Sequence, residues 1–215
     1  MASRTMHLAI ADKLIQRLDI DNEGRFRLGS ILPDAYHIGM GTAVSHFKTK
    51  ILNGTKSTYR LADFRREYDG KMFCDSLYLG YYMHLIQDML FRQFIYDVHK
   101  WDPSPNGNVD RLHNDYRLLN TYIIEKYNIS SGLDIPDDIF NEAIMHVYPF
   151  DLIQLKKDFI NDRVPYTEGS VFFFTEEMAD EFIISAADKC EKEIKALENG
   201  GYIIDETEYA WDVHT

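Results

Sequence analysis

A nearly continuous apolar segment in the middle of the chain, residues 78–91, contains a histidine and an aspartate four positions apart. The segment has no helix breaker after Gly80, and its length and composition predict a buried helix. On such a helix His84 and Asp88 share one face, with their side chains about 5–6 Å apart. Because an unpaired charge in apolar surroundings is very costly, the two side chains must bind each other or a neighbour, or together hold a metal ion.

Three more side chains that can bind metals come from separate segments before this helix. A first helix, near residues 5–18, has a stripe of apolar residues at helical spacing, and a helical wheel puts His7 within that stripe. Asp34 follows Pro33 in what the sequence predicts to be a tight turn, and His46 lies between Ser45 and Phe47. Imidazole nitrogens mixed with carboxylate oxygens suit zinc, iron or manganese.

Each of these residues also has an ordinary structural explanation. A single histidine on an apolar face is more often a hydrogen-bonded core residue than a metal ligand, and an aspartate after proline is more often a turn former or a helix cap. The pair His84 and Asp88 is the stronger evidence for a metal site, because a buried carboxylate needs a cation that this helix does not supply nearby.

The five residues occur in an order that resembles the zinc-dependent phospholipase C family, which is sometimes grouped with the S1/P1 nucleases. The stretches that carry the resemblance are 6–11, 28–35, 45–47 and 79–88, with a weaker continuation over 111–120. The resemblance implies an all-helical fold with a cluster of two or three metals that cleaves phosphodiester bonds. It also implies that the metal ligands are the counterparts of His7, Asp34, His46, His84 and Asp88.

Two parts of the family pattern differ in this chain. Secreted members use the amino group and carbonyl of a mature N-terminal Trp as ligands, whereas this chain begins Met1-Ala2-Ser3-Arg4. Members also close a second metal site with a His-x-x-x-Glu pair, but here His113 is followed four residues on by Arg117. We expect His113 to be the replacement ligand, because it opens a new amphipathic helix that can fold back on the first. His37 and Asp115 are further candidates for the second site or for substrate binding.

The composition limits the kinds of partner that we expect. The chain has 215 residues and a net charge of −12, with a pI of about 5.0, which argues against binding nucleic acid by a basic face and against docking on anionic membranes. A phosphate substrate remains compatible with this charge, because bound metals can invert the local sign. The two cysteines suggest neither a disulfide framework nor a thiolate zinc site. With no apolar run near 18 residues and no apolar signal core, we expect a cytoplasmic protein; its oligomeric state is left open.

Hydrophobic periodicity and breakers divide the chain into seven expected helices, near 5–18, 59–68, 72–100, 110–127, 137–147, 150–160 and 175–198. Long loops are expected over 20–57 and 161–174, and the only expected strand lies near 171–174. These elements predict an all-α class, with a metal-binding helical domain over 1–201 and an acidic, aromatic tail over 202–215.

The residues and the resemblance together favour a metal-dependent phosphoester hydrolase that uses zinc, with two or more ions, on a small phosphoester substrate. Metals would polarise a phosphoryl oxygen and lower the pKa of bound water toward 7, and Asp34 is the expected bridging carboxylate and candidate base. One alternative is a histidine/aspartate-domain (HD-type) metal phosphohydrolase, although the chain has no His-Asp dipeptide. The other is a helical binding protein with a partial, non-catalytic metal site. Two or more bound ions would favour catalysis, and one or none would favour binding.

Overall fold

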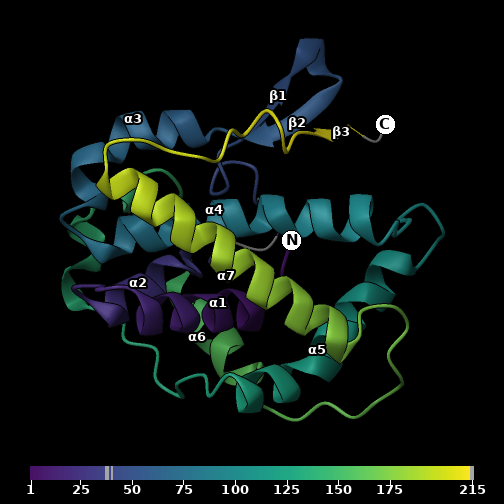
Figure 1. The fold of residues 1–215 in the computed structure, drawn as a ribbon. Helices are drawn as coiled ribbons and strands as arrows, with labels where there is room; N and C mark the ends of the chain where they lie inside the picture. The colour runs from purple at the N-terminus through teal and green to yellow at the C-terminus, as the bar shows by residue number, and fades with distance from the viewer. Residues whose placement is uncertain (37–38, 40, 214–215) are drawn as a thin grey trace.

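Helices make up most of the computed structural model, which describes residues 1–36, 39 and 41–213, and the all-α prediction is confirmed (Figure 1). Seven α-helices occur in this described part. They are α1 (Arg4–Arg17), α2 (Glu23–Gly29), α3 (Leu61–Met72), α4 (Ser76–Arg92), α5 (Asn108–Lys126), α6 (Leu152–Asn161) and α7 (Glu176–Glu198). A search of the described helices for a bilayer-spanning segment finds none.

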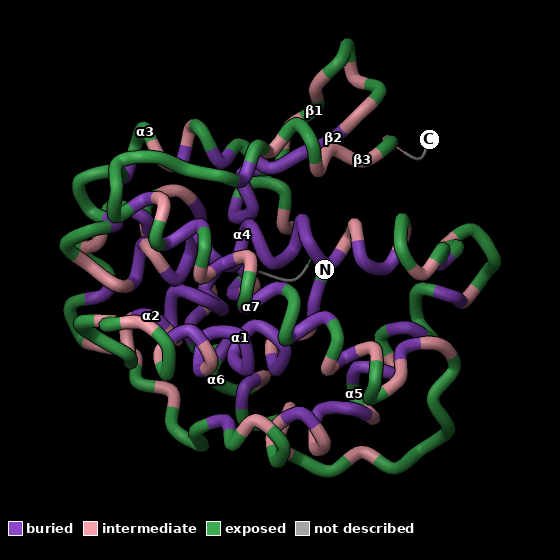
Figure 2. The backbone as a smooth tube through the Cα atoms, viewed as in Figure 1, coloured by how far each residue is buried: buried purple, intermediate pink, exposed green. Residues whose placement is uncertain are grey.

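Helix α4 forms the centre of the fold. All but three of its 17 residues are buried, as the apolar composition of this segment predicts. Figure 2 shows the helix in the buried colour through the middle of the molecule. Helices α1, α2, α3 and α7 all contact it. Burial on every side explains why the helix has no polar face, and it also means that any polar group on α4 must find its partner inside the protein.

Two glycines let α2 cross α4 with the backbones in contact. A Cβ atom on Gly29 would lie 2.1 Å from the carbonyl oxygen of Leu77, and one on Gly80 would lie 2.2 Å from that of Phe26. Both distances are too short for any side chain, so the crossing requires glycine on both helices. The close approach sets the position of Ser30, the residue that follows α2.

A small antiparallel sheet, absent from the sequence prediction, lies at one edge of the helices. Strands β1 (Lys48–Ile51) and β2 (Lys56–Tyr59) form a hairpin, and β3 (Trp211–Asp212) pairs with β2. The C-terminal segment, yellow in Figure 1, crosses the top of the molecule to reach the hairpin. The prediction of one long loop over 20–57 was therefore wrong, because this region contains α2 as well as the hairpin.

Three other expected elements differ from the structure. Residues 171–174 form no strand, because the amides of Phe172, Phe173 and Phe174 donate to the Asp115 carboxylate. The helix expected over 137–147 is two short 3₁₀ segments, Asp137–Asn141 and Ala143–His146. The helix expected over 72–100 begins only at Ser76, where the Asp75 side chain caps it by accepting from the Leu77 amide, and continues past Arg92 as the π-helical segment Gln93–Val98.

Candidate metal centre

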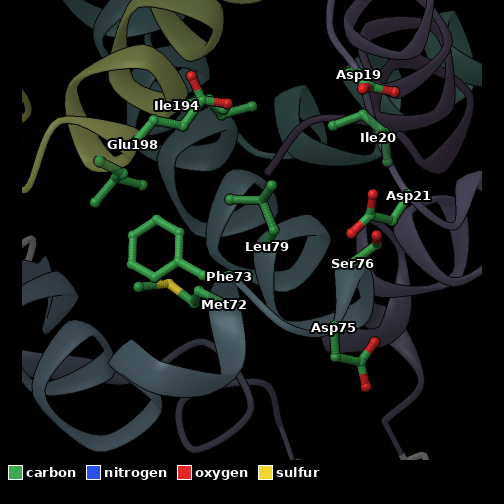
Figure 3. Close-up of a pocket in the computed structure, with 11 residues that line it drawn as sticks. Asp19, Ile20, Asp21, Met72, Phe73, Asp75, Ser76, Leu79, Ile194 and Glu198 are labelled. Carbon is green, nitrogen blue, oxygen red and sulfur yellow. The ribbon is translucent and has the colours of Figure 1, made fainter.

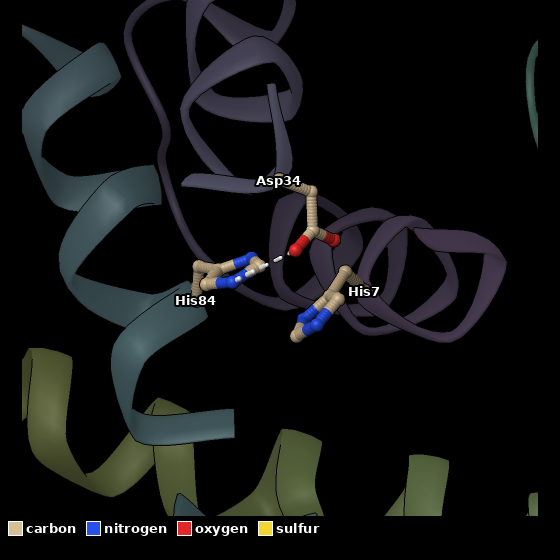
Figure 4. Close-up of side chains that lie close together, drawn as sticks. All are labelled: His7, Asp34 and His84. Atoms are coloured by element: carbon tan, nitrogen blue, oxygen red, sulfur yellow. Dashed lines mark ion pairs between the residues drawn. The ribbon is translucent and has the colours of Figure 1, made fainter. Parts of the chain in front are cut away.

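Five predicted residues from four parts of the chain meet inside the protein. His7 comes from α1, Asp34 from the short 3₁₀ segment Leu32–Asp34, His46 from the turn before β1, and His84 and Asp88 from α4. Four of them have at most 1% of their side chains exposed, and Asp34 has 11%. In the described part of the chain, two overlapping groups have the spacing to hold a metal ion: His7, Asp34 and His84 (Figure 4), and His46, His84 and Asp88.

The spacing of the donor atoms fits a small ion with nitrogen and oxygen ligands. His46 Nε2 lies 3.0 Å from His84 Nε2, and the two nitrogens lie 3.4 and 3.8 Å from Asp88 Oδ2. Their distances to Asp34 Oδ1 are 3.6 and 3.9 Å. A tetrahedral zinc ion with bonds of about 2.0–2.1 Å has ligand atoms about 3.3 Å apart. The measured distances scatter around that value.

The hydrogen bonds of the two histidines use their Nδ1 atoms and leave both Nε2 atoms facing the carboxylates of Asp34 and Asp88. His84 Nδ1 lies 2.8 Å from the Ser30 carbonyl and must donate to it, and His46 Nδ1 donates to the Thr42 carbonyl at 3.0 Å. Burial, together with the charge of His7, lowers the pKa of His84 to about 3. The two Nε2 atoms lie 3.0 Å apart, and a cation between them would bind both nitrogens.

Asp88 presents its two oxygens to different histidines. Oδ2 faces His46 and His84, whereas Oδ1 lies 3.4 Å from His7 Nε2. That nitrogen is buried without a hydrogen-bond partner, while His7 Nδ1 lies 2.7 Å from Gln87 Oε1. Burial alone would raise the pKa of Asp88, but His7 and His84 hold it below its usual range. A carboxylate shared in this way can bridge two metal ions.

The comparison with known protein families agrees with this geometry. The family model described as zinc dependent phospholipase C matches residues 6–130, more than half of the chain. The chain belongs to the zinc-dependent phospholipase C family. The matched range contains all five clustered residues, and the resemblance stated from the sequence is confirmed. Neither a curated protein nor a solved structure gave a significant match.

Local packing holds these family residues in place. The crossing of α2 and α4 at Gly29 and Gly80 brings the Ser30 carbonyl to His84. The hydroxyl of Tyr81, on α4, donates to the Ser45 carbonyl and so fixes the turn that carries His46. The carbonyl of Ala35, next to Asp34, accepts from the Asp151 amide at the start of α6. Partners of this kind orient metal ligands in proteins generally.

Asp34 connects the cluster to a cavity of about 390 Å³. The cavity wall also includes Arg4, Tyr36, His113 and Tyr116. A smaller cavity of about 180 Å³ lies near the C-terminal ends of α1, α3 and α7, with Leu79 and Ile194 among the side chains that line it (Figure 3). It contains none of the five clustered residues, whereas the cavity at Asp34 gives a ligand access to the cluster.

Two of the remaining predicted residues, His113 and Asp115, do not join the cluster. His113 lines the cavity with Asp34 but belongs to neither metal-sized group. Asp115 is buried elsewhere, with its two oxygens 2.8 Å from three backbone amides. His37 lies outside the described residues. Sequence reasoning missed Gln87, which contacts His7, although an amide in an apolar helix was itself a signal; nothing in the sequence marked Tyr59, whose hydroxyl lies 3.4 Å from Asp88.

Proposed function

We propose that this member of the family is a metal-dependent phosphoester hydrolase with zinc at the buried cluster. The observation that carries the proposal is the 3.0 Å approach of the His46 and His84 Nε2 atoms, both within 3.9 Å of the Asp34 and Asp88 carboxylates. A cation among these atoms would compensate the charges of the two carboxylates, which are costly to bury unpaired. Neutral imidazoles and carboxylates are the donor set that zinc takes in hydrolytic enzymes.

The donor atoms suggest how the residues would share the metal. His46, His84, Asp34 and Asp88 Oδ2 would hold one ion, and His7 with Asp88 Oδ1 would contribute to a second. Zinc, when bound, supplies a Lewis acid that polarises a phosphoryl oxygen and makes a nearby water more acidic. His113 remains our candidate for a further ligand, because it lines the same cavity as Asp34.

Asp34 is the proposed catalytic residue, because it belongs to both the cluster and the cavity. Burial alone would raise the pKa of this carboxyl, but His84 and His46 hold it well below its usual range. An ionised Asp34 can accept a hydrogen bond from the attacking water and orient it toward phosphorus. Its low pKa makes it a weak base, which favours this orienting role over full removal of the water's proton.

The cavity and the family together suggest the substrate. A volume of about 390 Å³ is near the lower end for small-molecule sites, so a soluble phosphoester or the head-group end of a phospholipid would fill it. We also propose a cytoplasmic location, which the free thiols of Cys74 and Cys190 support. Because the chain belongs to the zinc-dependent phospholipase C family, no separate observation favours the HD-type alternative.

The test uses bis-p-nitrophenyl phosphate and p-nitrophenylphosphorylcholine with the metal-loaded protein. We expect the protein to hydrolyse these esters and to lose this activity when a chelator removes the metal. Asp34→Asn should lower kcat by about 100-fold or more while the protein keeps most of its metal, and the exposed Asp69→Asn serves as the matched control. Undetectable turnover of both esters, in protein shown to hold two metals, would favour the non-catalytic binding protein.

A separate metal count tests His113. His113→Ala should lower the number of bound ions while leaving the ion at His46 and His84 in place. An unchanged metal count would remove His113 from the site without affecting the rest of the proposal.

A further inference from the structure

The cavity beside the cluster has one guanidinium on its wall. Arg4 is the first residue of α1, and its side chain is 15% exposed. It precedes His7 by three residues, so the two side chains lie on the same side of α1. Among the described residues that line the cavity, Arg4 is the only lysine or arginine, while Asp34, Asp158 and Asp162 are acids.

Two aspartates position this guanidinium without using up its hydrogen-bonding capacity. Arg4 Nη2 lies 3.4 Å from Asp158 Oδ2, and Nε lies 3.4 Å from Asp162 Oδ2. Both distances exceed the 2.7–2.9 Å of a charge-assisted hydrogen bond, and Nε is buried without a hydrogen-bond partner. Each aspartate also accepts a bond from elsewhere, Asp158 from Gln154 at 2.7 Å and Asp162 from Asn120 at 3.3 Å.

Arg25 shows what a purely structural arginine looks like in this protein. Its Nε donates to Asp75 at 2.7 Å, and its Nη2 donates to Glu142 at 2.7 Å. Those bonds are short and join separate segments of the chain. Arg4 is equally enclosed, at 15% against 14% side-chain exposure, yet its contacts are longer. The difference indicates that the Arg4 guanidinium has N–H donors left for a ligand in the cavity.

We propose that Arg4 binds a non-bridging oxygen of the substrate's phosphoryl group and determines specificity for phosphate in this cavity. The proposal rests on the phosphoester hydrolase function. A guanidinium presents planar, paired N–H groups that match phosphate oxygens, which a lysine ammonium does not. Without Arg4, the carboxylates of Asp158 and Asp162 would repel an anion approaching Asp34.

The test measures binding of inorganic phosphate to the metal-loaded protein by isothermal titration calorimetry. Arg4→Gln should weaken phosphate binding by about 10- to 100-fold, the loss expected for a hydrogen bond to a charged group. The control Arg66→Gln removes an arginine whose side chain is 77% exposed on α3 and should bind phosphate like the wild type. The Michaelis constant for bis-p-nitrophenyl phosphate should rise by the same factor in Arg4→Gln.

Metal content and a second variant make the outcome decisive. Wild-type phosphate affinity in Arg4→Gln, or no phosphate binding by the wild type, would overturn the proposal. If Arg4→Gln loses metal or fails to fold, Arg4→Lys decides, since it keeps the positive charge: weaker phosphate binding at wild-type metal content supports the role of Arg4, and unchanged binding overturns it.

The two proposals can fail separately. Phosphate binding that depends on Arg4, without turnover of any ester, would leave the Arg4 site standing and refute the hydrolase. If the wild type hydrolyses an ester but Arg4→Gln binds phosphate as tightly as the wild type, the Arg4 site is refuted and the hydrolase proposal stands.

Discussion

Adding one methyl group at Gly80 should disturb both the core and the metal cluster. A Cβ at this position would lie 2.2 Å from the Phe26 carbonyl oxygen, and α2 would have to move by about 0.8 Å to reach even 3.0 Å. The same movement would stretch the 2.8 Å bond between His84 Nδ1 and the Ser30 carbonyl, at most to about 3.6 Å, a length at which it is no longer a hydrogen bond. Gly80→Ala therefore couples a packing defect to the orientation of a metal ligand.

The expected size of the effect follows from these two losses. Overpacking and the lost hydrogen bond together should lower the free energy of unfolding by about 2–4 kcal/mol, and the Tm by about 4–16 °C. Loss of the bond that orients His84 should weaken metal affinity by about 10- to 100-fold. Calorimetry of the chelator-treated protein gives the first quantity, and competition with a chromophoric chelator gives the second.

Gly70→Ala makes the same chemical change where there is room. Gly70 is an exposed residue of α3, and a Cβ there would meet nothing within 4 Å. Alanine is the better helix former, so this variant should gain about 0.5–1 kcal/mol and keep wild-type metal affinity. The reasoning is refuted if Gly80→Ala melts no lower than Gly70→Ala and binds metal as tightly.

Three further predictions concern other buried groups. Asp115→Ala leaves three amides of the 172–174 segment without an acceptor, so it should cost about 1–3 kcal/mol and speed limited proteolysis near that segment; wild-type cleavage would contradict this. Glu193→Ala removes the acceptor for the amides of Ile203 and Ile204 and should speed cleavage of the C-terminal segment, whereas equal rates would show that β3 alone holds it. Ellman's reagent should titrate one thiol quickly, the exposed Cys74, because burial raises the pKa of Cys190 to about 12; two fast thiols would disprove the buried position.

The centre of the fold and the candidate cluster could be predicted because their signals are local. An apolar run with two polar residues four apart predicts both the burial of α4 and the shared face of His84 and Asp88. Pro33 restricts the backbone before Asp34, and this residue does lie in a short 3₁₀ turn. The family resemblance came from the order of these residues along the chain, because members of the family share that order.

Elements that depend on distant partners were missed. Helix α2 has seven residues, too few for a periodic pattern, and it owes its place to the glycine on α4. The apolar run at 171–174 has high strand propensity, but its amides bond to a side chain some 57 residues earlier. The hairpin did have a local signal, because Asn-Gly pairs are common in hairpin turns. Asn53 and Gly54 lie in the four-residue loop 52–55, where both have positive φ.

The most direct test of the central claim is the metal content of the purified protein, measured by elemental analysis together with X-ray absorption at the zinc edge. If the cluster is a metal centre, protein never exposed to chelator should contain about one to two equivalents of zinc, and both His84→Ala and Asp88→Ala should lose it. Less than about a tenth of an equivalent of any transition metal in the wild type would contradict the account. So would wild-type zinc content and stability in both variants, because His84 and Asp88 would then be no more than a buried contact within the core.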